Sequence, residues 1–285
     1  MVEGILVAVG IVTLATLIWA VARASRPRFA LRQQTVEIPL VLLNLVQDLQ
    51  LHRGLSGAVL AGQTDLNGEL DACGHKLERS LYALADQYGE RQPIFKSPQW
   101  RTVLGRWESL RNNWRELDFH TNLLVHSELV TGLTGILRSF AADHADRLGA
   151  DRSRMLATWP TLIEHLGMLR GLGMCLLSSR DEDPATPVHA SLADYLQRAR
   201  QALATIADTV NDHPTLVTSE RALRRVAWLL DGNAGRYHTY PFYEEMTAVI
   251  DGWYRLISTR MLAECRNRSA RERLATYARI HLKPG

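Results

Sequence analysis

The stretch LQLHRGLSGAVLAG, residues 49–62, has a counterpart later in the chain, LGMLRGLGMCLLSS at residues 166–179. When the two are aligned without gaps, the tripeptide Arg-Gly-Leu at 53–55 coincides with Arg-Gly-Leu at 170–172. The copies are 117 residues apart (53 to 170), which is too long for the repeat of a solenoid. This spacing favours a chain built from two halves of similar construction.

Both arginines occupy the apolar stripe of a predicted helix. Apolar and small residues recur by fours and threes around each arginine, as they do on one face of an α-helix. The two stripes are Leu42, Val46, Leu49, Arg53, Ser56 and Leu60, and Ile163, Leu166, Arg170, Gly173 and Leu177. An inward charge costs several kcal/mol or more unless it has a partner. The function of the chain therefore depends on what neutralises these arginines.

Length and composition predict a globular chain. It has 285 residues, of which 46% are hydrophobic and 22% charged, so it can bury a core and is not disordered. The net charge of +3 is small and diffuse, which argues against nucleic-acid binding. Cys73, Cys175 and Cys265 are odd in number and widely spaced. They predict neither a disulfide framework nor a metal motif.

After the first 35 residues nearly the whole chain is predicted to be helical, because no alternating β-branched runs occur. The first half, about 36–149, is expected to hold four helices, and the second half, about 150–265, another four. The predicted ranges are 36–61, 67–88, 98–118 and 122–147, then 151–180, 189–211, 218–232 and 241 to beyond 260. Pro39 suggests that the regular part of the first helix begins there. A charged, amphipathic tail follows at Arg266 to Arg279.

Three tryptophans mark one of these helices. Trp100, Trp107 and Trp114 repeat every seven residues, which is typical of a packing seam in a helical bundle. We therefore predict that Trp107, in the middle of the series, is buried at a contact between helices.

Residues 4–22 are apolar and uncharged over 19 residues, long enough to span a bilayer. The basic residues follow this segment, at Arg23, Arg26, Arg28 and Arg32, so it is predicted to be an uncleaved anchor. The positive-inside rule then places the rest of the chain in the cytoplasm. The alternative is the same anchor in the opposite orientation, with a periplasmic domain. The fold prediction is therefore all-α: a transmembrane helix with its basic flank (1–32), followed by a domain of two four-helix bundles (33–285).

Three features resemble the nitrate- and nitrite-sensing (NIT) domain family. They are Arg-Gly-Leu-Ser at 53–56, its echo Arg-Gly-Leu-Gly at 170–173, and the segment YPFYEEMTAVID at 240–251, which is similar to the aromatic, Thr and Ile-Asp pattern of the family's last helix. The resemblance covers roughly residues 36 to 262.

The resemblance implies an all-helical sensor that binds nitrate or nitrite with arginines from both halves. Arg53 and Arg170 would be ligands, and a further arginine is expected from a later helix, with Arg225 and Arg236 as candidates. Ser56 is placed to donate a hydrogen bond to the anion. The planar guanidinium fork suits a planar oxyanion, and two inward arginines would repel each other without an anion between them.

The predicted protein is thus a non-catalytic sensor in the inner (cytoplasmic) membrane of a bacterium. We expect it to act as a homodimer, to pass its signal to an unidentified signalling protein, and to need neither metal nor cofactor. The scattered histidines form no metal-binding motif and are interpreted as surface or hydrogen-bonded core residues. The rival hypothesis is a helical scaffold in which each arginine pairs with a buried carboxylate, such as Glu128, Glu164 or Asp48. An enzyme has almost no support, because no nucleophile elbow, P-loop or dinucleotide fingerprint is present.

Overall fold

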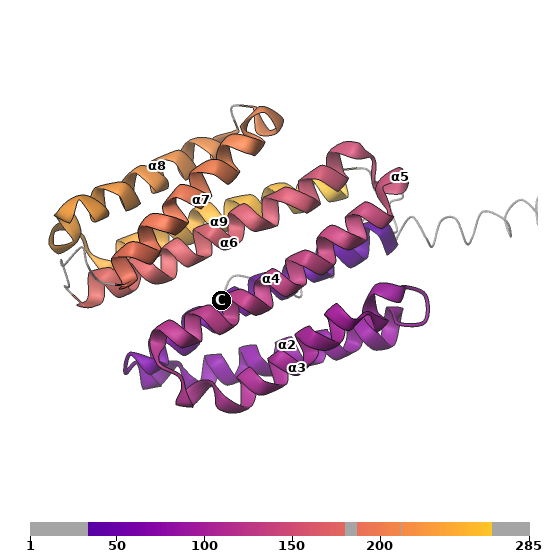
Figure 1. Ribbon diagram of the computed structural model, residues 1–285, viewed down its shortest axis with the longest axis horizontal. Helices are drawn as coiled ribbons and strands as arrows, with labels where there is room; N and C mark the ends of the chain where they lie inside the picture. The colour runs from indigo at the N-terminus through magenta and orange to yellow at the C-terminus, as the bar shows by residue number, and fades with distance from the viewer. Residues whose placement is uncertain (1–33, 180–186, 212, 264–285) are drawn as a thin grey trace, which may run out of the picture. The chain divides into compact units, whose positions relative to one another are not determined.

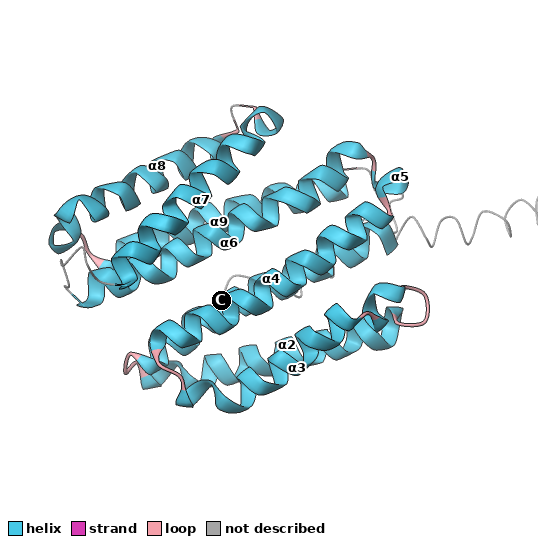
Figure 2. Cartoon of the chain, in the orientation of Figure 1, coloured by secondary structure: helices cyan, strands magenta, loops and turns pink. Residues whose placement is uncertain are grey.

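The computed structural model describes residues 34–179, 187–211 and 213–263. Residues Pro39–Met261 form one compact unit, to which all packing below belongs. Helices make up almost all of the described residues, and no strand occurs among them (Figure 2). The predicted all-α class is therefore confirmed.

One set of helices comes from the first part of the chain (Figure 1). It contains the helix over residues 34–60, α2 (Asn67–Tyr88), α3 (Pro98–Asn113) and α4 (Phe119–Asp143), with the short turns η1 (Thr64–Leu66), η2 (Pro93–Lys96) and η3 (Trp114–Glu116). His52 on the first helix contacts Trp107 of α3 and His126 of α4. Asp48 on the same helix forms an ion pair with Lys76 of α2. The helix over residues 34–60 is therefore in contact with the other three.

A second set follows after the four-residue helix α5 (Ala145–Leu148). It contains α6 (Ala150–Ser179), α7 (Pro187–Val210), α8 (Pro214–Trp228) and α9 (Thr239–Leu262), with η4 (Leu229–Asn233) and η5 (Ala234–Arg236) between the last two. Trp253 of α9 packs edge-on against Trp159 of α6, and its indole N–H donates to Ser219 of α8 over 2.9 Å. Because α6 packs on both α7 and α4, it joins the two sets.

The tryptophan seam is confirmed. Trp100 and Trp107 are each 1% exposed and Trp114 is 4% exposed. Trp107 contacts His52 on the helix over residues 34–60, and Trp100 packs edge-on against Phe95 of η2.

Three helix boundaries differ from the prediction. The helix predicted from 218 begins at Pro214, because His213 caps it: its Nδ1 accepts the Thr215 N–H over 3.2 Å. The last helix begins at Thr239 and not after Pro241, since a proline in the first turn removes no helical hydrogen bond. Residues 34–38 are already helical, so the expected start at Pro39 is wrong and Pro39 lies inside the helix.

Close approach between helices depends on small residues of the repeat. A Cβ atom at Gly171 would lie 2.8 Å from Cδ1 of Leu123 on α4, and one at Gly173 would lie 2.4 Å from the Phe242 ring on α9. Both distances are shorter than real contacts of a Cβ atom, so larger residues would force α6 away from its neighbours. The small residues after Arg170 thus fit α6 between α4 and α9.

Among the described residues, no helix has the length and apolarity needed to cross a membrane. The predicted anchor at residues 4–22, its basic flank to residue 32 and the tail at Arg266 to Arg279 lie outside the described residues.

Candidate functional site: a buried polar layer between the two helix sets

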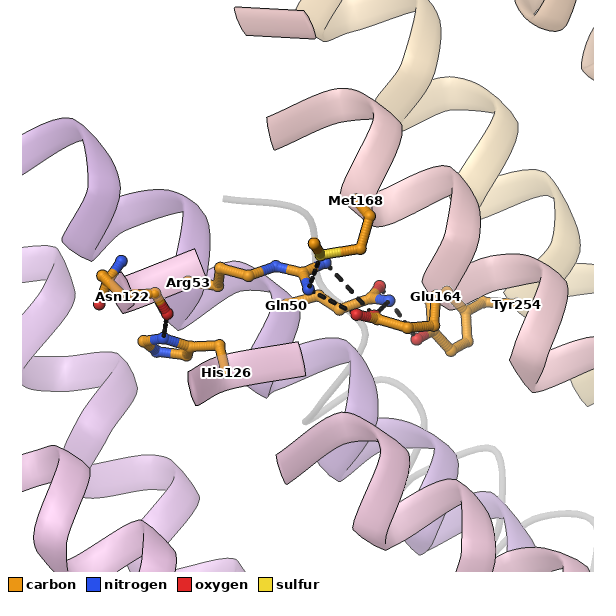
Figure 3. Close-up of polar contacts among 7 residues, drawn as sticks. All are labelled: Gln50, Arg53, Asn122, His126, Glu164, Met168 and Tyr254. Carbon is orange, nitrogen blue, oxygen red and sulfur yellow. Dashed lines mark hydrogen bonds and ion pairs between the residues drawn. The ribbon is translucent and has the colours of Figure 1, made fainter. Parts of the chain in front are cut away.

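Arg53, on the helix over residues 34–60, forms a two-pronged ion pair with Glu164 of α6 (Figure 3). Its Nη1 lies 2.6 Å from Oε1 of the carboxylate and its Nη2 lies 3.3 Å from Oε2. The two side chains are buried, with residue exposures of 4% and 6%. Paired guanidinium and carboxylate groups of this geometry form the strongest class of protein hydrogen bonds. Arg53 is therefore neutralised inside the chain, as the scaffold hypothesis requires.

Two further side chains complete the surroundings of Glu164 (Figure 3). Gln50 Nε2 donates to Glu164 Oε2 over 2.9 Å, and the hydroxyl of Tyr254 on α9 donates to Gln50 Oε1 over 3.2 Å. Burial raises the pKa of Tyr254 well above its ordinary value, so the hydroxyl stays protonated and remains a donor. The network thus ties the helix over residues 34–60 to both α6 and α9.

Arg170 is buried too, at 8% exposure, but it lacks such a partner. Its Nη1 donates to Thr247 Oγ1 over 2.9 Å, and its guanidinium lies over the Tyr243 ring, 5.3 Å from the centroid. Within the described ranges no carboxylate lies within ion-pair distance of Arg170. Burial lowers the pKa of Arg170, and the charge of Arg53 also lowers it. Arg170 is therefore a buried cation held by a neutral hydroxyl and a ring.

Asp251 is a carboxylate whose charge raises the pKa of Arg170, and it is only partly buried. Its carboxylate is partly exposed and accepts a long hydrogen bond of 3.5 Å from Gln47. Burial raises the pKa of Asp251, whereas the positive charges of Arg255 and Arg170 lower it. Asp251 forms no ion pair with Arg170 among the described residues, so it influences Arg170 through its charge and not by contact.

The other candidate residues lie elsewhere. The Ser56 hydroxyl bonds with the Asn122 side chain and with the Arg53 carbonyl oxygen, so it belongs to the first helix set. Arg225 lies between the rings of Trp228 and Tyr237, with Glu245 3.7 Å away. Arg236 is exposed and contacts Asn233. Ser56 thus contacts only the backbone of Arg53, and within the described ranges neither Arg225 nor Arg236 meets Arg53 or Arg170.

Of the carboxylates named as alternative partners, Glu164 alone pairs with an arginine of the repeat in the described part of the chain. Asp48 pairs with Lys76 over 2.8 Å, and the exposed Glu128 pairs with Arg106 over 3.1 Å. The expected partner was thus found for Arg53 and not for Arg170.

A buried pair of histidines lies beside the ion pair in sequence. His52 Nδ1 and His126 Nε2 are 2.8 Å apart, and the two residues are 3% and 0% exposed. His126 Nδ1 lies 2.8 Å from the carbonyl oxygen of Asn122, which can only accept, so this nitrogen carries the proton. His126 Nε2 then accepts a hydrogen bond from His52. No third ligand suited to a metal ion joins the pair among the described residues.

The free energy of unfolding should fall as the pH is lowered from about 6.5 to about 4, because burial lowers the pKa of His52 from its ordinary 6.5 to about 4. Between these two pH values His52 is protonated in the unfolded chain and neutral in the native protein, so lowering the pH favours unfolding. The loss from His52 alone should approach about 3 kcal/mol, measured by urea denaturation at a series of pH values. Replacing both His52 and His126 with leucine should flatten this dependence, whereas replacing the exposed His75 with glutamine should leave it. An unchanged slope in the double variant would contradict the assignment.

Three hollows over the described residues are lined by neither arginine. One of them, of about 1160 Å³, lies along α3 and α4. Beside Arg53 the space is filled: a Cβ atom at Gly167 would lie 2.5 Å from its Nη2. Arg53 therefore lies in a closely packed part of the layer.

Comparisons of the chain with protein-family models, with curated proteins and with solved structures found no match.

Gln50, Tyr254, Thr247 and the histidine pair were not anticipated as partners. The sequence held a signal for two of them: Gln50 precedes Arg53 by one turn, and Thr247 lies within the segment 240–251 that resembles the last NIT helix.

Proposed function

We propose that this protein is a membrane-anchored, non-catalytic sensor that binds nitrate or nitrite in the polar layer around Arg170 and Arg53. One observation carries the proposal: Arg170 is buried and charged, and no carboxylate contacts it in the described part of the chain. A buried cation without a counter-ion is costly, and a small anion would remove that cost. The resemblance to the NIT family names the anion as nitrate or nitrite.

The geometry around Arg170 suits this ligand. Nη1 is engaged by Thr247, and the Tyr243 ring stacks on the guanidinium, which leaves its other donors for an acceptor. The four donors that remain lie in one plane and suit a planar oxyanion such as nitrate, and arginine stays charged at any relevant pH.

The signal would pass through the helices that meet at this layer. They are the helix over residues 34–60, α6 and α9, and the first of these follows the proposed anchor at residues 4–22. An anion shifts the arrangement of these helices only by binding one arrangement more tightly than another. We propose that the two helix sets are the two bundles of the domain, that the domain lies in the cytoplasm as a homodimer, and that the anchor or the dimer interface conveys the change to a signalling partner.

A helical scaffold without a ligand is the second candidate, and the Arg53–Glu164 ion pair favours it. In that case the polar layer only aligns the two helix sets. The two candidates differ in what nitrate does to the stability of the protein.

Nitrate should raise the melting temperature of the full-length protein. A ligand that binds only the folded state stabilises it by about 2.7 kcal/mol at a hundred times its dissociation constant. Replacing Arg170 with methionine should abolish this rise while costing the ligand-free protein little, because the change removes a cation that has no carboxylate partner. The measurement is thermal denaturation followed by circular dichroism, with and without sodium nitrate, against sodium chloride at equal ionic strength.

Arg200→Met is the matched control, since Arg200 is an exposed arginine on α7. It should retain the full response. Arg170→Lys keeps the charge but loses the planar fork, so it should recover only part of the response. If nitrate protects wild type and Arg170→Met equally, the anion binds elsewhere. If it protects neither, the scaffold candidate stands.

A further inference from the structure

The buried charged side chains of the polar layer add up to one positive charge, whereas Asp251 at its margin is partly exposed and is offset by Arg255. Arg53, Glu164 and Arg170 are the buried ionic groups there, contributing +1, −1 and +1. Asp48, which is also buried, is compensated by Lys76. A buried region with a low dielectric constant tolerates net charge poorly. The net charge of the layer therefore decides which ion can enter it.

Glu164 contributes the one buried negative charge that faces the arginines in the described part of the layer, and its carboxylate is held in place by hydrogen bonds. Both of its oxygens accept from Arg53, and Oε2 also accepts from Gln50. Arg53 is held in turn, with Gly167 against its Nη2 and Met168 Sδ 3.2 Å from its Nη1 (Figure 3). The carboxylate thus occupies the guanidinium fork that faces it and behaves as a built-in anion of the layer.

We propose that Glu164 is the specificity-determining residue of the anion site, admitting one monovalent anion and excluding divalent oxyanions such as sulfate. This inference rests on the proposed function. A monovalent anion at Arg170 brings the layer to zero net charge, whereas sulfate would leave it at −1 beside the Glu164 carboxylate.

The test compares nitrate and sulfate on the full-length protein by isothermal titration calorimetry. Wild type should bind nitrate and discriminate against sulfate. Glu164→Gln keeps the shape and the Gln50 contact while raising the layer to +2, so sulfate affinity should rise relative to nitrate by roughly tenfold or more. Glu128→Gln removes the same charge from an exposed ion pair with Arg106 and should leave the ratio at the wild-type value.

A second pair of variants tests whether the net charge of the layer controls anion binding, without changing the Arg53–Glu164 ion pair. Thr247→Asp places a carboxylate at the atom position that now accepts from Arg170, bringing the layer to zero charge with no ligand. Nitrate affinity should then be lower, by roughly tenfold or more, than in the isosteric but neutral variant Thr247→Asn. These variants decide the question if Glu164→Gln does not fold.

The outcomes separate the inference from the function on which it rests. Wild type that binds neither ion overturns the proposed function. Wild type that binds nitrate and sulfate equally overturns the role of Glu164 and leaves nitrate binding in place. The role of Glu164 is also overturned by a Glu164→Gln ratio within about twofold of wild type, or by equal nitrate affinity in Thr247→Asp and Thr247→Asn.

Discussion

Replacing Arg53 with alanine is expected to lower the free energy of unfolding by about 3–5 kcal/mol, because it leaves the Glu164 carboxylate buried and without its cation. Gln50 alone would remain to solvate that charge by a hydrogen bond. If Arg53 and Arg170 only repelled each other across an anion site, removing Arg53 need not destabilise the ligand-free protein. The ion pair reverses that expectation. Urea denaturation followed by circular dichroism measures the difference.

An exposed arginine of similar chemistry provides the control. Arg106→Ala breaks the exposed pair with Glu128 and should cost at most about 1 kcal/mol. The double variant Arg53→Met with Glu164→Met removes both charges at similar volume, so it should regain most of the stability lost in Arg53→Ala. A cost below about 1 kcal/mol for Arg53→Ala would show that the ion pair does not hold the two helix sets together.

Trp107→Ala should cost about 3–5 kcal/mol in the same measurement, because it empties the centre of the first helix set. The side chain is 1% exposed, and its ring packs edge-on against His52 with the centroids 5.2 Å apart. The loss combines the transfer of a large apolar surface with the cavity left behind. Removing this ring also removes its packing contact with His52 of the histidine pair.

Tyr240→Ala is the matched aromatic truncation for this experiment, since Tyr240 is 67% exposed. It should change the free energy of unfolding by no more than about 0.5 kcal/mol. If Trp107→Ala were equally mild, the seven-residue tryptophan spacing would have to be read as a surface pattern.

The helices and the tryptophan seam were predictable because they follow from periodicity within one segment. Apolar residues at helical spacing lie on the buried faces of their helices, as expected. Gly62 and Gly149 have the positive φ angles that are common in turns between helices. The start of α8 was not predictable in the same way, because histidine is an unusual N-cap and its role depends on one side-chain rotation. The anchor and the tail stay predictions.

For the site, the sequence predicted that Arg53 and Arg170 face inward, but it did not predict the side chains with which they pair. Arg53 and Arg170 are buried as their stripes indicated. The partner of Arg53 lies 111 residues further along the chain, so its identity depends on how the two helix sets pack. The histidine pair joins residues 74 apart and has no local signal. Local periodicity carries no information at that range.

The pairing of Arg53 with Glu164 also shows how the two copies of the repeat differ. In the gapless alignment of the two halves, the residue in register with Glu164 is Gln47, an amide in place of a carboxylate. Two equivalent halves would supply one carboxylate to each arginine, whereas this chain supplies one carboxylate for two arginines. Arg53 therefore ties the two helix sets together through Glu164, whereas Arg170, at the equivalent position of the repeat, has only Thr247 as a hydrogen-bond partner among the described residues.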